Sequence, residues 1–443
     1  MKNWIVAGVA CVALTVAAAP AQGAAAAATN PELPAPGSTY GGAADQAISA
    51  FYASRGGAPL WLRAGGDSSA ATTLLGVLQR ASLDGLPSGP ALALQAQSLM
   101  ARASMGDAQT AADADRLLTT AWVLYVQALQ RPPAGMIYAD KWVTPRQETP
   151  SQILVRTGAA KSLSAYVRQV SAVNPLYAQL REAAWSDMQA RGGTLDPRVL
   201  ASLDRIRDMP FQNRYVIVDA AGAKLYMIED GQIADSMRVI VGKADPSTQT
   251  PMLASTIYYA TLNPYWHVSQ DAIRSTIARN VLNQGLSYLK TRGYQVMAAD
   301  ASDDSLLDPA TVNWHAVADG TEKIRVRQLP GPANSMGKLK IGFPNEQDIY
   351  LHDTPVKAAF SSDERGLSHG CIRLEDAERL GRWLLGHDPN SDATGSPEQH
   401  ALLPSPTPIY VTYLTAQVQD GRLAYVDDIY GRDAPPQIAS TAN

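Results

Sequence analysis

Residues 214–219 have the sequence RYVIVD, and there the periodicity of this chain changes from helical to strand-like. A second apolar run, KLYMIE at 224–229, follows the short turn AAGA, and Asp230-Gly231 makes another turn before a third run at 237–241. Short runs of β-branched and aromatic residues joined by tight turns are typical of antiparallel strands. The sequence therefore predicts a mixed or antiparallel, sandwich-like β-domain over about residues 211–432.

Strand-like runs recur towards the C-terminus, at 255–262, 338–341, 349–352, 408–414 and 422–426. Between them, residues 263–330 lose the alternating pattern and contain a helical run at 271–282. We expect these residues to form a helical or loop insertion within the β-domain. Long insertions beside a site are often lids, and an immobile helical buttress is the alternative.

Upstream of the β-domain, residues 44–210 have helical spacing. Apolar residues such as Leu118, Trp122 and Tyr125 recur at three- and four-residue steps, and further helical runs cover 151–173 and 176–191. We expect an all-helical domain here, so that the fold class of the whole chain is α+β.

The N-terminus has the features of an export signal. Lys2 gives a positive start, residues 4–19 are apolar, and Ala19-Pro20-Ala21 fits a small-x-small cleavage site. We expect residues 1–21 to be a signal peptide, residues 22–43 a flexible linker and residues 433–443 a flexible tail. A retained N-terminal anchor is the alternative, and no later segment is long and apolar enough to predict a membrane span.

Composition excludes several classes of function. The chain has 443 residues, a formal net charge of -4 and no basic block, so nucleic acid is not an expected partner. The six histidines show no paired metal-ligand spacing, and there is no Cys-x-x-Cys motif. No glycine-rich phosphate loop occurs either, so we expect neither a metal nor a cofactor.

The stretch SHGCIR at 368–373 carries the candidate chemistry. Cys371 is one of two cysteines, and the other, Cys11, lies in the expected signal peptide. A lone thiol with imidazoles nearby suggests a nucleophile. His352, 19 residues upstream at the end of an expected strand, is our candidate general base. His369 would lie on the opposite face of an extended segment from Cys371, so we assign it to substrate contact.

Two further residues of this stretch have expected roles. Gly370 permits unusual backbone torsions, and the amides of Gly370 and Cys371 are candidates for an oxyanion hole. Arg373 shares a strand face with Cys371 and is expected to bind a substrate carboxylate. A surface salt bridge with Glu375 or Asp376 is the alternative for Arg373.

His352 followed by a loop and then SHGCIR resembles the signature of L,D-transpeptidases. In that family the upstream histidine is the base and the cysteine carries the acyl group. Similar stretches occur at 249–251 (QTP), 262–266 (LNPYW), 327–332 (RQLPGP) and 349–355 (IYLHDTP). Within them and the central motif, Tyr350, Trp266 and Ser368 are expected to contact substrate. Residues 51–61 resemble the start of the helical scaffold of the family's large periplasmic members, so we expect a periplasmic enzyme.

The resemblance implies acyl transfer on peptidoglycan stem peptides. The cysteine would displace the terminal D-Ala of a tetrapeptide donor, and the side-chain amine of diaminopimelate on an acceptor stem would complete a 3→3 cross-link. Acylation by carbapenems and contact with other cell-wall enzymes are also implied, as is the lack of a stable membrane span after signal cleavage. Water as the acceptor, giving an L,D-carboxypeptidase or endopeptidase, and a non-catalytic wall-binding scaffold are the alternatives.

The chain departs from the family pattern in two places. No clear peptidoglycan-binding module occurs between residues 150 and 210, where relatives often carry one. Asp353 follows the expected base where some relatives have serine. We therefore expect a backbone carbonyl, rather than a side chain, to orient His352.

Overall fold

The computed structural model describes residues 42–63, 65–207 and 213–433. The expected signal peptide, nearly all of the expected linker and all but the first residue of the expected tail lie outside these residues. Within the described residues, no helix has both the length and the apolarity needed to cross a membrane.

The N-terminal part of the described chain is helical, as expected from its spacing. Ser162 caps one helix and Thr149 forms a capping box at the start of another, so the run predicted over 151–173 is two helices instead of one. The helices are α1 (Gly42–Ser54), α2 (Ala70–Gln79), α3 (Gly89–Ala103), α4 (Ala108–Leu129), α5 (Pro150–Ala159), α6 (Leu163–Ala172), α7 (Pro175–Ala190) and α8 (Pro197–Arg207).

A buried carboxylate organises the polar interior of the helical part. Asp115 of α4 is 1% exposed. One oxygen, Oδ1, accepts the main-chain N–H groups of Trp61 and Leu62 at 2.7 and 2.8 Å. The other, Oδ2, accepts the N–H of Leu60 at 2.7 Å and the hydroxyl of Tyr52 at 2.6 Å. Buried carboxylates need such partners, and every oxygen of Asp115 has two.

The C-terminal part is a closed mixed sheet, which confirms the α+β class. Eight strands follow one another in the order β5-β13-β2-β3-β4-β12-β10-β9, and β9 pairs with β5 to close the ring. Closure removes the sheet edges and joins the two expected layers into one barrel. The strands are β2 (Arg214–Asp219), β3 (Lys224–Glu229), β4 (Gln232–Gly242), β5 (Leu253–Leu262), β9 (Leu339–Gly342), β10 (Tyr350–His352), β12 (Ile372–Leu374) and β13 (Gln399–Thr412).

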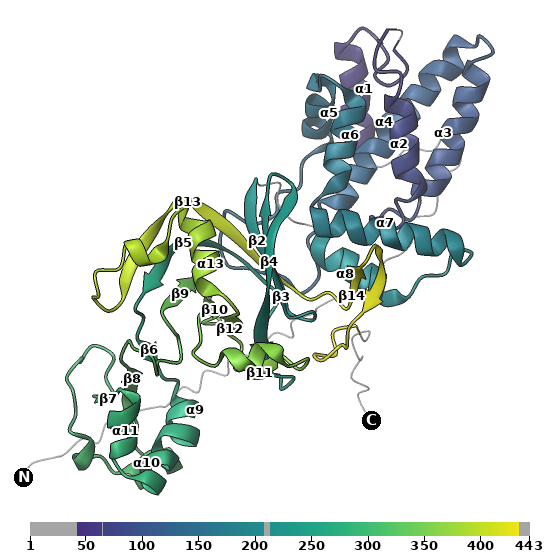
Figure 1. The fold of residues 1–443 in the computed structure, drawn as a ribbon. Helices are drawn as coiled ribbons and strands as arrows, with labels where there is room; N and C mark the ends of the chain where they lie inside the picture. The colour runs from purple at the N-terminus through teal and green to yellow at the C-terminus, as the bar shows by residue number, and fades with distance from the viewer. Residues whose placement is uncertain (1–41, 64, 208–212, 434–443) are drawn as a thin grey trace, which may run out of the picture. The chain divides into compact units, whose positions relative to one another are not determined.

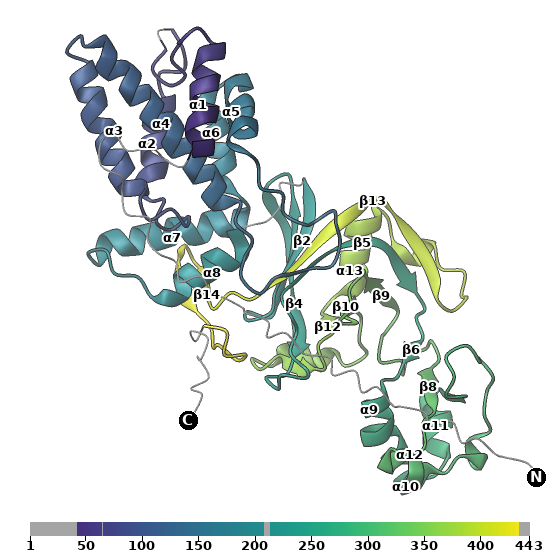
Figure 2. The ribbon, with the colours of Figure 1, turned by 180° about the vertical axis from the view of Figure 1, so that it is seen from behind.

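Pairing in the ring mixes both directions. The meander β2–β3–β4 is antiparallel, as the turns predicted. Strand β13 pairs in parallel with β2 and antiparallel with β5, and Figures 1 and 2 both show it beside these strands. Strands β10 and β12 are parallel neighbours. Two short strands lie outside the ring: β1 (Ile137–Tyr138) pairs with β5, and β11 (Gly366–Ser368) pairs with β4.

Alternation along the strands fills the barrel. Leu351 and Ile372, directly opposite each other in β10 and β12, are both fully buried. Helix α13 (Ala377–Leu385) packs against β9 and β13 and buries Leu380 and Leu384. The barrel wall that holds the central motif is thus packed with buried side chains of one core, which fixes the backbone at 351–352 and 372–373.

Residues between β5 and β9 form a small unit with a hydrophobic core of its own. Ile277, Val296 and Val326 are among the buried residues of that core. Strands β7 and β8 were not predicted, because such short runs among helices show no clear alternation. The elements are β6 (Trp266–His267), α9 (Gln270–Ala272), a π-helical stretch (Ile273–Ala278), α10 (Arg279–Gln284), α11 (Ser287–Arg292), β7 (Tyr294–Met297), α12 (Trp314–Asp319) and β8 (Arg325–Gln328).

The described chain ends in a hairpin and a short tail. Strands β14 (Ala416–Gln419) and β15 (Arg422–Tyr425) pair antiparallel. Residues 428–433 then return to contact α8 and the loop after β4. Of this hairpin, only the second strand was predicted.

Candidate active site

Cys371 lies in a tight turn between β11 and β12. Gly370, immediately before it, has φ +110°, a conformation that L side chains rarely adopt. The Ser368 hydroxyl accepts the N–H of Gly370 at 3.1 Å and donates to the carbonyl of Cys371 at 2.6 Å. The predicted nucleophile is therefore held at the start of β12 by bonds within its own motif. Ser368 was predicted to contact substrate. It is 2% exposed, and both hydrogen bonds of its hydroxyl are made within the turn.

The sulfur of Cys371 is surrounded by groups of the chain leading into β10. Its Sγ donates to the carbonyl of Asp348 at 3.4 Å. The N–H and the hydroxyl of Tyr350 both hydrogen-bond to the sulfur, and the charge of Lys340 also favours the thiolate. Burial outweighs these effects and raises the pKa of the thiol. Cys371 is consequently a neutral thiol at rest and needs a base to become a nucleophile.

His352 is a buried neutral base. It is 3% exposed, and its Nδ1 lies 2.5 Å from the carbonyl oxygen of Asp353. A carbonyl can only accept, so Nδ1 carries the proton and Nε2 keeps its lone pair. Burial, reinforced by the charges of Arg373 and Lys340, lowers the pKa of His352 to about 4. The orienting partner is a backbone carbonyl, as the sequence suggested.

The carboxylate of Asp353 is engaged elsewhere. It accepts the N–H of Lys338 at 3.0 Å and forms an ion pair with Lys357 at 2.6 Å. These bonds turn the side chain away from the His352 ring and fix the peptide whose carbonyl meets Nδ1. Asp353 thus acts on His352 through its main chain.

Strand pairing brings the predicted base and nucleophile to the same part of the barrel. His352 is directly opposite Arg373 in the parallel pair β10–β12. Cys371 and Tyr350 each lie two residues earlier. Among the described residues, the hydrogen bonds of the sulfur go to Asp348 and Tyr350, and none joins it to the His352 ring. Catalytic hydrogen bonds often tighten only when substrate binds, so this assignment stays a prediction.

Arg373 lies near both the predicted base and the predicted nucleophile. Its electrostatic interactions are with Cys371 and His352. No side-chain hydrogen bond or ion pair of Arg373 occurs within residues 42–63, 65–207 and 213–433. The alternative of a salt bridge with Glu375 does not hold, since Glu375 pairs with Arg238. A partly buried guanidinium without a carboxylate partner is available to bind one from a substrate.

The other predicted contact residues are spread more widely. Tyr350 touches the sulfur, and its ring centroid lies 5.7 Å from that of His352. His369 is exposed at the tip of the turn. Trp266 belongs to the insertion, where its ring packs near that of Tyr294. Throughout the described chain, no three potential metal ligands form a cluster.

Three residues near the thiol were not predicted as site residues from the sequence. Lys340 is placed by β9–β10 pairing, which sets it opposite His352. Asp348 acts through its carbonyl, so its side-chain type carries no information. Thr250 reaches the turn from the loop after β4 and donates to the carbonyl of Gly370 at 2.7 Å. The stretch at 249–251 was noted only as a family likeness.

Comparison with known proteins agrees with this architecture. Residues 213–434 match the model of the L,D-transpeptidase catalytic domain. The chain belongs to the L,D-transpeptidase family. Residues 46–183 match a scaffold domain, and so the helical part also has a counterpart among known proteins.

Individual relatives are distant. A Haemophilus influenzae protein named "Putative L,D-transpeptidase" is 25% identical over 401 residues, covering 88% of this chain and 79% of its own. An L,D-transpeptidase structure from Mycobacterium smegmatis is 14% identical, with a TM-score of 0.21, and covers 45% of this chain and 58% of its own. The E. faecium L,D-transpeptidase catalytic domain is 16% identical, with a TM-score of 0.20, and covers 46% of this chain and 98% of its own. The chain thus spans little more than half of the mycobacterial structure.

Proposed function

We propose that this protein is a peptidoglycan L,D-transpeptidase that forms 3→3 cross-links through a thioester on Cys371. The observation that carries the proposal is a neutral thiol in the turn that leads into β12 and a neutral, oriented imidazole on β10, the parallel neighbour of β12. A neutral base beside a neutral thiol can accept its proton when the sulfur attacks. Family membership supports acyl transfer as the reaction class.

In the first half-reaction, Nε2 of His352 takes the thiol proton as Sγ bonds to the carbonyl carbon that precedes the terminal D-Ala. The carbonyl oxygen becomes an oxyanion. The N–H of Gly370 already donates to the hydroxyl of Ser368, so the N–H of Cys371 is the donor in this turn that can bind the oxyanion. The C–N bond then breaks, the imidazolium gives its proton to the leaving D-Ala amine, and a thioester remains.

In the second half-reaction, an acceptor amine attacks the thioester carbonyl. His352 accepts a proton from this amine, the C–S bond breaks, and the proton passes to the sulfur. The thiol is restored and the new amide is the cross-link. We propose that Arg373 holds a stem carboxylate during these steps, because its guanidinium has no carboxylate partner among the described residues.

We further propose that the protein acts in the periplasm after export. The basis is the sequence of its first residues and the wall substrate that the family acts upon. Fractionation of cells producing the full chain tests this proposal. We expect a processed protein in the periplasmic fraction, and an unprocessed protein retained with the cytoplasm would refute it.

Incubation with purified disaccharide-tetrapeptide tests the reaction, with the Cys371→Ala variant as the control. We expect release of D-Ala and a dimer joined by a 3→3 bond from the wild type alone. Tripeptide without dimer would make water the acceptor and the protein a carboxypeptidase. No release of D-Ala and no mass gain with a carbapenem would favour a non-catalytic scaffold.

A further inference from the structure

A chain of hydrogen bonds runs from helix α8 to the peptide unit immediately before Cys371. Its last member is Thr250, which is fully buried in the loop after β4. The Thr250 hydroxyl accepts the N–H of Gly242 at 2.8 Å and donates to the carbonyl of Gly370 at 2.7 Å. A hydroxyl has one proton to donate, and Thr250 donates it to the carbonyl of Gly370 in the turn that carries Cys371.

Fixing this carbonyl fixes the amide of Cys371. The carbonyl of Gly370 and the N–H of Cys371 belong to one planar peptide unit and point in opposite directions. Gly370 has φ +110° and no Cβ, so its own torsions leave this unit free to rotate. The Thr250 hydroxyl therefore adds, to the bonds made by Ser368 within the turn, the bond that fixes this peptide unit and with it the direction of the Cys371 N–H.

The loop that carries Thr250 is clamped by the C-terminal segment. Arg432 donates to the carbonyl of Thr250 at 2.9 Å. The Tyr430 hydroxyl donates to the carbonyl of Gly242 at 2.7 Å and accepts the N–H of Thr250 at 3.4 Å. Thr250 is thus held on its N–H, its carbonyl and its hydroxyl at once.

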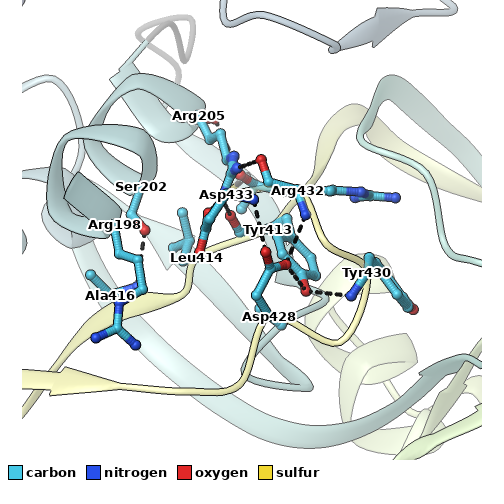
Figure 3. A network of polar contacts seen from close by, with 12 residues as sticks. Arg198, Ser202, Arg205, Tyr413, Leu414, Ala416, Asp428, Tyr430, Arg432 and Asp433 are labelled. Atoms are coloured by element: carbon cyan, nitrogen blue, oxygen red, sulfur yellow. Dashed lines mark hydrogen bonds and ion pairs between the residues drawn. The ribbon is translucent and has the colours of Figure 1, made fainter. Parts of the chain in front are cut away.

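The C-terminal segment is in turn fastened to Tyr413 and to α8 (Figure 3). Tyr413 donates to Asp428 at 2.8 Å, and its ring stacks on that of Tyr430 with centroids 5.1 Å apart. Arg205 of α8 donates to the carboxylate of Asp433 at 2.7 Å and to the carbonyl of Arg432 at 2.6 Å. The helical part of the chain therefore supports the loop beneath the thiol through a continuous set of bonds.

We infer that Thr250 is a positioning residue for acyl transfer, and that its hydroxyl aims the Cys371 N–H at the oxyanion formed during acylation. This inference rests on the proposed function of Cys371. The segment at 428–433 and Arg205 of α8 keep Thr250 in place. Thr250 touches no reacting atom and acts through the peptide that it orients.

A matched pair of variants tests the inference. Thr250→Val keeps the volume and removes the hydroxyl, whereas Thr250→Ser keeps the hydroxyl. Each is compared with the wild type in two reactions of the same sulfur. The first reaction is acylation by a carbapenem, which passes through an oxyanion and is monitored by mass spectrometry of the intact protein. Alkylation by iodoacetamide displaces iodide from carbon and forms no oxyanion.

We expect Thr250→Val to lose at least about tenfold in acylation rate, because a misaligned oxyanion donor costs up to about 10²–10³ in rate. Its alkylation rate across pH should match that of the wild type. Thr250→Ser should acylate within about threefold of the wild type, since the donor is retained.

Three results would overturn the inference. Thr250→Val acylating like the wild type would show that the hydroxyl orients nothing. Parallel losses in acylation and alkylation would show a general disturbance of the site, and so would a serine variant as poor as the valine variant. If the wild type itself takes no acyl group, the proposed function fails, and this inference falls with it.

Discussion

The polar cluster around Asp115 in the helical part and the one around Cys371 in the barrel are built on opposite principles. Each oxygen of Asp115 accepts two hydrogen bonds, so the carboxylate is saturated. At the barrel site, no carboxylate of the described residues pairs with Arg373, and Nε2 of His352 has no hydrogen bond among those residues. In a saturated cluster the hydrogen bonds stabilise the folded protein, whereas in an open cluster the polar groups remain available to bind a substrate. Mutations in the Asp115 cluster should therefore lower the stability of the protein, and mutations in the Cys371 cluster should lower its acylation rate.

Replacing the expected base should have the largest effect. His352→Ala leaves the neutral thiol of Cys371 without a proton acceptor, and we expect carbapenem acylation to fall by about 10²–10⁴. The midpoint of thermal unfolding should change little by comparison. The exposed His369 is the control, since His369→Ala should keep most of the activity. Equal losses in the two variants would remove His352 from its assigned role.

Asp115→Asn should show the reverse pattern. The substitution removes the negative charge of a carboxylate that accepts four hydrogen bonds. We expect the free energy of unfolding to fall by about 2–4 kcal/mol. The acylation rate per folded molecule should stay at the wild-type value. Asp113→Asn, on the exposed face of the same helix, should leave stability nearly unchanged. A lower acylation rate in Asp115→Asn would contradict the separation of the two clusters.

The pH dependence should report the buried imidazole. The pKa of His352 is about 4 in the folded protein and near 6.5 in the unfolded chain. The unfolded state thus binds more protons between these values, and stability falls as the pH drops from about 6.5 to 4, by up to about 3 kcal/mol. The acid limb of the acylation rate should lie near pH 4. Urea unfolding at several pH values checks this, with His352→Gln predicted to flatten the loss.

Arg373→Ala should give the smallest of these effects. Loss of a charge-assisted pair to a substrate carboxylate should weaken tetrapeptide use by about tenfold. Thiol alkylation by iodoacetamide should change much less, because that reagent offers no carboxylate. The exposed Arg382 of α13 provides the control, Arg382→Ala. Normal turnover of tetrapeptide by Arg373→Ala would exclude it from substrate binding.

Local pattern predicted the parts of the molecule that depend on near neighbours. The helical scaffold, the β2–β3–β4 meander and the family motif all follow from short stretches of sequence. The closure of the barrel by β5 and β9 depends on pairing across a long insertion, and the parallel placement of β13 beside β2 joins residues about 190 positions apart. No local periodicity encodes such pairings.

The same limit applies to the site. Cys371 and His352 were found because their side chains carry the chemistry. Asp348 and Asp353 act through main-chain carbonyls, which every residue has. Thr250 matters through a bond formed only when the loop after β4 meets the turn at Gly370. Such contributions become visible only in three dimensions.

Mass spectrometry of the protein quenched during turnover of disaccharide-tetrapeptide tests the central claim most directly. The account predicts that the proteolytic fragment containing Cys371 gains the mass of the substrate less that of D-Ala, and that Cys371→Ala shows no such gain. An acyl group found on a different residue, or dimer formed with no acylated protein at any time, would contradict it.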